Sequence, residues 1–328
     1  MNRRAFLMTS LCCPRLVEAQ AEITQPVVAE TDAPLEVITP TAHEGHRGSG
    51  VLRKPPGNGP FPAMVHLHGG ITTMPVPSLR TTATNGANPS RFLAAGYVVV
   101  VPTYRSRDID PQSSVSLDDA VAVVDYVRAL PYVDDESIVV FGCSGGGDLA
   151  LQVPTRTKVC GVVAEEPASM VMAGMFNNRV PKKGERYTPE DSFFMMENPR
   201  EHYTPEFQEI LRAKVAKITC PILIVQGDVD RREVPISKFN AEILIPELRA
   251  AKKTVEVRSY AGQGHCFCAG SGVPRPSGRP TSVSASPAAL AAFKEIDSFY
   301  RKYLPLKPRN IDAALLTHVP VRTSWQSH

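Results

Sequence analysis

A glycine-flanked serine constrains the fold of this 328-residue chain more than any other feature of its sequence. Residues 142–146 read Gly-Cys-Ser-Gly-Gly, after an apolar run at 137–141 and before a segment, 147–151, with the composition of a helix start. A tight turn from strand into helix leaves room for little more than a hydrogen atom two residues before and two residues after the serine. The motif therefore predicts a buried strand, a sharp turn that raises Ser144 above the edge of a sheet, and a helix.

Apolar runs of strand length recur along the chain and alternate with segments of helical spacing. Helical spacing is clear at residues 116–130 and 288–304, whereas residues 71–90 show little periodicity and are expected to form a loop. We therefore predict an α/β fold with a mostly parallel, doubly wound sheet. The expected strands are residues 35–39, 50–54, 63–67, 97–101, 137–141, 158–164, 221–226 and 254–258.

Polar groups suited to catalysis follow several of these strands. Asp230 and His265 each come shortly after an expected strand, and a His-Gly-Gly sequence at 68–70 follows another. The carboxyl ends of parallel strands meet at one edge of a sheet, where open α/β sheets place their ligands and catalytic groups. We therefore expect these groups to gather around Ser144.

In these motifs and their order, the chain resembles the α/β-hydrolases of the prolyl-oligopeptidase and dienelactone-hydrolase-like group, over roughly residues 60–305. The resemblance implies an α/β-hydrolase fold and places the acid three residues after a glycine, at Asp230. Prolyl oligopeptidases carry a large β-propeller before their catalytic half, and too few residues precede His68 for such a domain to be expected. The matching segments are residues 65–70, 99–105, 142–150, 227–235 and 264–267.

These residues predict acyl transfer through a covalent serine intermediate. A serine hydroxyl is a weak nucleophile at neutral pH, so Ser144 needs a base within hydrogen-bond reach, and His265 is the best candidate. Asp230 would hold the imidazole in the required tautomer and stabilise its protonated form. The developing oxyanion would be bound by backbone N–H groups of Gly145 and of either Gly69 or Gly70.

Other residues compete for these roles. His66 and His68 are alternative bases, although both precede the serine and belong to the expected oxyanion loop. Asp228 competes for the acid position on the same turn as the favoured aspartate. Glu165 and Glu166 follow a strand end, where one of them could be a substituted acid or a substrate contact, or the pair could cap the next segment.

The alternation of strands and helices breaks at about residues 167–216, where methionines and aromatic residues mix with charges and prolines. We expect a small cap insertion there, which either offers an adaptable apolar surface to a substrate or only packs onto the domain. The candidate substrate contacts are Cys143, Glu166, Met172 and Phe176.

Composition narrows the possible partners. A net charge of +3 is too small to indicate nucleic acid or an anionic membrane as a partner, and no apolar run approaches the ~20 residues of a membrane span. His43 and His46 lack further ligands nearby, and no dinucleotide fingerprint is present, so we expect neither a metal nor a cofactor. The cysteines downstream of residue 21 are odd in number and are expected to be small buried side chains.

The first residues predict export. Arg3 and Arg4 followed by an apolar stretch resemble a twin-arginine signal, with small residues near Ala19 and Ala21 for cleavage. Residues 1–21 are thus an expected signal and residues 22–328 the hydrolase domain; the alternative is a cytoplasmic protein with an irregular N-terminal tail.

The sequence favours a serine hydrolase that cleaves a small carboxylic ester. A small serine peptidase acting on short peptides is the alternative, and a non-catalytic binding member of the fold is a second one. The oligomeric state is left open.

Overall fold

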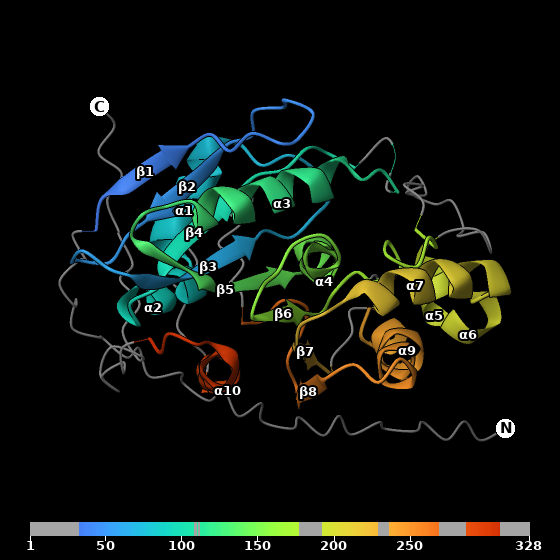
Figure 1. Cartoon of the computed structure of the whole chain (residues 1–328). Coiled ribbons are helices and arrows are strands. Elements are labelled where there is room, and N and C mark those ends of the chain that lie inside the picture. Colours follow the sequence, from blue (N-terminus) through green and yellow to red (C-terminus); the bar gives the residue numbers. More distant parts are fainter. Residues whose placement is uncertain are drawn as a thin grey trace, which may run out of the picture.

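A single mixed sheet forms the centre of the molecule. The structure, a computed structural model, describes residues 33–107, 110, 112–176, 192–228, 236–268 and 287–308. The sheet has eight strands in the order β1-β2-β4-β3-β5-β6-β7-β8 (Figure 1). The pairs β1/β2 and β2/β4 are antiparallel and all others are parallel, which confirms the mostly parallel sheet predicted from the sequence. The strands are β1 (Leu35–Ile38), β2 (Gly50–Arg53), β3 (Phe61–Leu67), β4 (Val98–Pro102), β5 (Val133–Cys143), β6 (Gly161–Glu165), β7 (Ile222–Gly227) and β8 (Val255–Tyr260).

Helices cover both faces of the sheet, so the central strands are buried on both sides. In β4, Val98 and Val100 belong to one apolar cluster while Val99 and Val101 belong to the other, as the two-residue period of a strand requires. One cluster receives side chains from α3 (Val115–Arg128), α4 (Gly145–Gln152), α7 (Pro205–Lys217), α8 (Ile236–Phe239) and α9 (Ile245–Ala250). The other receives them from α1 (Val76–Asn85), α2 (Ala87–Ala94) and α10 (Pro287–Tyr303).

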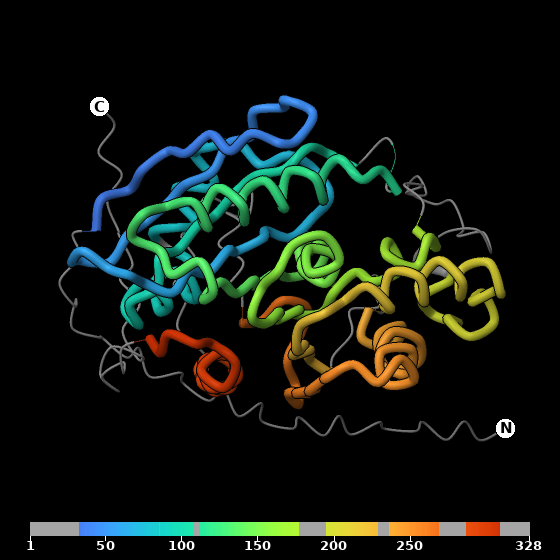
Figure 2. The backbone as a smooth tube through the Cα atoms, viewed as in Figure 1, coloured from blue at the N-terminus to red at the C-terminus, as the bar shows by residue number. Residues whose placement is uncertain are grey.

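The last helix that the structure describes, α10, covers the second face. Figure 2 shows α10, in red, beside α2, although the two are far apart in the chain. Phe92 of α2 and Phe293 of α10 meet edge to face with ring centroids 5.0 Å apart. The Tyr300 hydroxyl donates to the carbonyl oxygen of Val140 at 2.7 Å, so α10 is also bonded to the strand that leads into the serine turn.

The loop expected at residues 71–90 is wrong, because α1 and α2 occupy most of that segment. Proline and threonine in α1 are poor helix formers and hide the period, yet Leu79 and Ala83 are buried four residues apart. Burial of Phe92 and Leu93 from α2 completes this side of the core. Packing against the sheet, rather than intrinsic propensity, makes these helices.

The expected cap is described only in part. Residues 177–191 lie outside the described residues, and the block continues with α5 (Ser192–Glu197), α6 (Pro199–His202) and α7. Met170, Met172, Met175 and Met196 are all buried in the cluster that contains α3 and α4. Among the helices that the structure describes, none combines the length and the apolar character that crossing a bilayer demands.

Candidate active site

Ser144 occupies the turn between β5 and α4, where the sequence predicted it. Its backbone has φ 54° and ψ −120°, a left-handed conformation that is uncommon for any residue other than glycine. A Cβ at Gly142 would overlap the carbonyl oxygen of Gly146, so glycine is needed for the chain to fold back this closely. The Ser144 side chain is half-buried and therefore partly open to solvent.

The glycine loop after β3 packs directly on this turn. A Cβ at Gly145 would overlap the carbonyl oxygen of Gly70, and a Cβ at Gly69 would lie 3.7 Å from the Cβ of Ser144. Gly145 is the first residue of α4, and its N–H is one of the groups that an α-helix leaves without an internal partner. The structure thus brings Gly69, Gly70 and Gly145 to the serine, as an oxyanion site requires.

Two buried histidines shape the glycine loop. The His68 ring stacks on Tyr104, with centroids 4.2 Å apart, and its Nδ1 donates to the carbonyl oxygen of Gly69 at 2.8 Å. The Tyr104 hydroxyl donates to the carbonyl oxygen of His68, and the His66 ring stacks on Phe141. Burial lowers the pKa of His66 to about 3 and the pKa of His68 to about 4, so both rings are neutral at pH 7. These contacts favour a structural role for the two alternative bases.

The ring of His265 contacts the carboxylate of Glu166. The imidazole Nδ1 lies 2.7 Å from Oε2 of Glu166, whose side chain is only 3% exposed while that of His265 is 22% exposed. The same carboxylate accepts two backbone hydrogen bonds, from Gly227 N to Oε1 at 2.8 Å and from Cys266 N to Oε2 at 2.6 Å. The sequence proposed Glu166 as a substrate contact or a substituted acid, and in the structure its carboxylate contacts the imidazole of His265.

Backbone strain is concentrated in this site. Among the described residues other than glycine, only four have positive φ, and three of them are Ser144 at 54°, Glu166 at 41° and Cys266 at 56°. The fourth, Lys252, lies in the connection between α9 and β8. Each such residue costs about 1–3 kcal/mol and persists only where the surrounding structure imposes it, commonly at functional sites. Three of the four strained residues therefore belong to the candidate site, where the contact between Glu166 and His265 is found.

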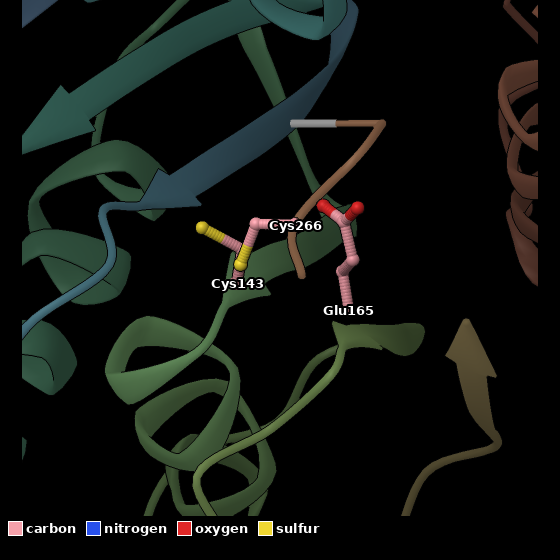
Figure 3. Close-up of side chains that lie close together, drawn as sticks. All are labelled: Cys143, Glu165 and Cys266. Atoms are coloured by element: carbon pink, nitrogen blue, oxygen red, sulfur yellow. The ribbon is translucent and has the colours of Figure 1, made fainter. Parts of the chain in front are cut away.

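Two thiols and a carboxylate, those of Cys143, Cys266 and Glu165, lie close together (Figure 3), and Cys143 directly precedes Ser144 in the chain. Ligand-type atoms of Cys143, Glu165 and Cys266 all lie within 4.8 Å of one another, and so do those of Glu166, His265 and Cys266. A hydrogen bond between the Cys143 and Cys266 thiols, together with burial, raises the pKa of Cys266 well above its usual value. Glu165 Oε1 accepts a hydrogen bond from Cys268 N at 2.6 Å. These hydrogen bonds account for the cluster, so we assign it no metal.

The remaining candidate residues from the sequence differ in where the structure places them. Asp230 lies outside the described residues, so its predicted role stays a prediction. Asp228 is described, and its Oδ1 accepts a hydrogen bond from Gly262 N at 2.6 Å. Met172 has no exposed surface and would have to move to contact a substrate, whereas Phe176 is half-buried. The sequence pointed to Glu166 only through its position at a strand end.

The comparisons with known proteins agree with this geometry. A serine on a strand–helix turn at the carboxyl edge of such a sheet is the arrangement of the α/β-hydrolases, a class that includes many serine hydrolases. The chain matches the prolyl oligopeptidase family over residues 86–281, more than half of its length, and it belongs to that family. No curated protein matches the chain by sequence.

Solved structures share the fold at low identity. A thermostable esterase from Pseudomonas putida is 18% identical with a TM-score of 0.57, covering 85% of this chain and 86% of its own. A puromycin-hydrolyzing peptidase of Mycobacterium tuberculosis is 17% identical with a TM-score of 0.59, covering 87% of this chain and 41% of its own. An acylaminoacyl peptidase of Pyrococcus horikoshii is 15% identical with a TM-score of 0.57, covering 87% and 44%. The chain is thus a serine hydrolase by family and an α/β-hydrolase by fold.

Proposed function

We propose that the protein hydrolyses carboxylic esters in two steps through an acyl-Ser144 intermediate. The observation that carries the proposal is the left-handed serine between β5 and α4, with the glycine loop packed against it. Ser144 Oγ attacks the ester carbonyl while His265 Nε2 takes its proton. The N–H groups of Gly145 and of Gly69 or Gly70 bind the oxyanion of the tetrahedral intermediate.

Collapse of that intermediate releases the alcohol, which receives the proton from His265. Water then attacks the acyl group with His265 again acting as base, and Ser144 is regenerated. The contact between His265 Nδ1 and a carboxylate supports this role, because a carboxylate beside Nδ1 favours the tautomer in which Nε2 can accept a proton.

The comparison with whole chains favours an ester substrate over a peptide. The esterase from Pseudomonas putida and this chain cover each other almost completely, whereas less than half of either peptidase is matched. An ester also demands less of the catalyst, because an alkoxide leaves more readily than an amine. A peptidase that acts on short peptides is the second candidate, supported by the family that the chain belongs to.

Labelling and substrate profiling test the proposal together. A fluorophosphonate probe should modify the protein at Ser144, and Ser144→Ala should abolish both labelling and hydrolysis of aryl esters. Ser259→Ala, at an exposed position on β8, is the matched control and should retain both.

Three outcomes would contradict the proposal in different ways. Labelling that persists in Ser144→Ala would move the nucleophile elsewhere. Cleavage of prolyl or aminoacyl amides with negligible esterase activity would favour the peptidase. A folded protein that the probe does not label would favour a binding protein.

Export is a separate proposal. The twin-arginine signal predicted at residues 1–21 lies outside the described residues. Fused to a reporter that functions only outside the cytoplasm, these residues should direct its export, and Arg3→Lys with Arg4→Lys should block it. Export that is unchanged in the double variant would reject the twin-arginine signal.

A further inference from the structure

We propose that Glu166, at the carboxyl end of β6, is the positioning residue that orients His265, in place of Asp230 after β7. This inference rests on the proposed function, since it concerns the acid partner of the base that activates Ser144. It goes beyond the family resemblance, which places the acid after β7. Four features of the described residues carry it.

The first feature is direct contact in a buried setting. Glu166 Oε2 lies 2.7 Å from His265 Nδ1, and the glutamate side chain is 3% exposed. The attraction between a carboxylate and an imidazole nitrogen strengthens where water is excluded. Glu166 is therefore well placed to fix the imidazole ring and to stabilise the charge that forms on it during catalysis.

The second feature is the way the carboxylate itself is held. Gly227 N donates to Oε1, and Cys266 N donates to the same Oε2 that faces the histidine. An ionised carboxylate accepts on both oxygens, whereas an amide must present donors on one side. The two N–H groups thus fix the orientation of the carboxylate, and an amide in its place would have to turn its NH₂ toward at least one of them.

The third feature is the backbone at the end of β6. Glu166 has φ 41°, its N–H donates to the carbonyl oxygen of Val225 at 2.8 Å, and Ser144 N donates to the carbonyl oxygen of Glu165 at 2.9 Å. A residue that served only as a turn or cap at this φ would be glycine or asparagine at lower cost. A glutamate held there indicates that its side chain has a function, and its strand is bonded directly to the serine turn.

The fourth feature is that a carboxylate oxygen already occupies the Nδ1 side of the His265 ring. An imidazole nitrogen carries at most one proton to donate, so a second carboxylate that took this role would have to displace Glu166. The described aspartate on the turn after β7, Asp228, is bonded to Gly262 N instead. Asp230 is the other candidate for the acid that orients His265, and the experiment compares the two residues.

The decisive comparison is Glu166→Gln against Asp230→Asn. In Glu166→Gln the amide NH₂ must face either Gly227 N–H or the pair formed by Cys266 N–H and His265 Nδ1. The first arrangement opposes two donors, and the second forces the wrong tautomer on the histidine. We expect kcat for an aryl acetate to fall by about 10⁴-fold with KM changed little, the size seen when a triad aspartate becomes asparagine. Asp230→Asn should retain most of kcat.

A spectroscopic readout separates positioning from folding. In protein labelled with ¹⁵N-histidine, the Nδ1–H proton of His265 should give a downfield resonance in the wild type and in Asp230→Asn. Glu166→Gln should lose it, and Glu166→Asp, which keeps a carboxylate, should restore part of the resonance and part of kcat. If Glu166→Gln does not fold, Asp230→Ala provides the test. Retention of the resonance and of the activity in that variant supports Glu166 as the residue that orients His265, and their loss overturns the assignment.

The possible failures are distinguishable. If the wild-type protein neither hydrolyses esters nor reacts with a fluorophosphonate, the proposed function itself is contradicted. A wild-type protein that does both, with Glu166→Gln near normal and Asp230→Asn inactive, would overturn only the assignment of Glu166.

Discussion

Arg107 and Asp148 form an ion pair at the start of the helix that follows Ser144, with Nη1 and Oδ2 3.1 Å apart and both side chains at most 2% exposed. The pair links three segments of the site. Arg107 Nη2 also donates to the carbonyl oxygen of Gly145 at 3.2 Å, and Asp148 Oδ1 accepts from Met172 N at 2.9 Å. Burial raises the pKa of Asp148 above its ordinary value, and the positive charge of Arg107 partly offsets this rise. The ionised form of the carboxylate therefore depends on Arg107.

Asp148→Asn should therefore destabilise the protein strongly, because it removes the buried carboxylate that pairs with the charge of Arg107. We expect a loss of about 3–5 kcal/mol in the free energy of unfolding, measured by chemical denaturation. Asp125→Asn is the control: Asp125 pairs with Arg128 on the surface, its side chain is 56% exposed, and such pairs contribute about 0–1 kcal/mol. Equal losses in the two variants would contradict this account.

Close backbone approach makes Gly146 intolerant of any side chain. A Cβ there would overlap the carbonyl oxygens of His68 and Leu67, so Gly146→Ala should push the glycine loop away from the serine turn. We expect esterase activity to fall by at least about 100-fold, as for loss of an oxyanion donor. Gly48→Ala meets only an ordinary contact at 3.6 Å and should behave as wild type. An active Gly146→Ala enzyme would show that the loop does not hold the oxyanion.

The buried neutral His66 predicts a loss of stability in mild acid. Its folded pKa of about 3 is below its unfolded value of about 6.5, so the unfolded chain binds the extra proton as pH falls. The contribution is complete above pH 6.5 and is lost as pH falls from there toward 3. Between pH 7 and pH 5 it amounts to about 2 kcal/mol.

His66→Phe removes that titration and keeps a ring to stack on Phe141. Its free energy of unfolding should fall by about 2 kcal/mol less than that of the wild type between pH 7 and pH 5. Parallel pH profiles for the two proteins would mean that His66 is not kept neutral by burial.

Met172 and Phe176 should respond differently to truncation. Met172 is fully buried, so Met172→Ala should cost about 2–5 kcal/mol of stability through the cavity it leaves. Phe176 is half-buried, and Phe176→Ala should cost less but shift kcat/KM toward longer acyl chains, at up to ~0.8 kcal/mol for each buried methylene. Aryl esters of graded chain length and thermal melts of both variants provide the test. A specificity shift in Met172→Ala without one in Phe176→Ala would reverse the assignment.

The parts of the fold that could be predicted are those whose sequence pattern and burial agree. Strand β4 is a continuous run of valines and is buried on both faces, so one pattern gave both its type and its position. Helices α1 and α2 could not be predicted, because only the sheet they pack on reveals which residues face the core. The serine turn was predictable because its glycines are required by backbone sterics within five residues.

The sequence offered several carboxylates as partners of His265, Glu166 among them, but could not choose between them. Residues after β6 and after β7 emerge at the same edge of the sheet, and chain order does not say which carboxylate faces the imidazole. The choice depends on Gly227 N and Cys266 N, two backbone donors that orient Glu166 and leave no trace in residue types.

The bonds that hold Glu166 also fix when the site can exist during folding. Its carboxylate is bonded to residues 61 and 100 positions further along the chain. Contacts so distant in sequence form only after the intervening strands have closed, since the entropy of closing the loop must be overcome first. Under the proposed function, a nascent chain that has completed β5 and α4 carries the serine without its base, and hydrolytic activity begins only when β7 and the turn of His265 after β8 are in place.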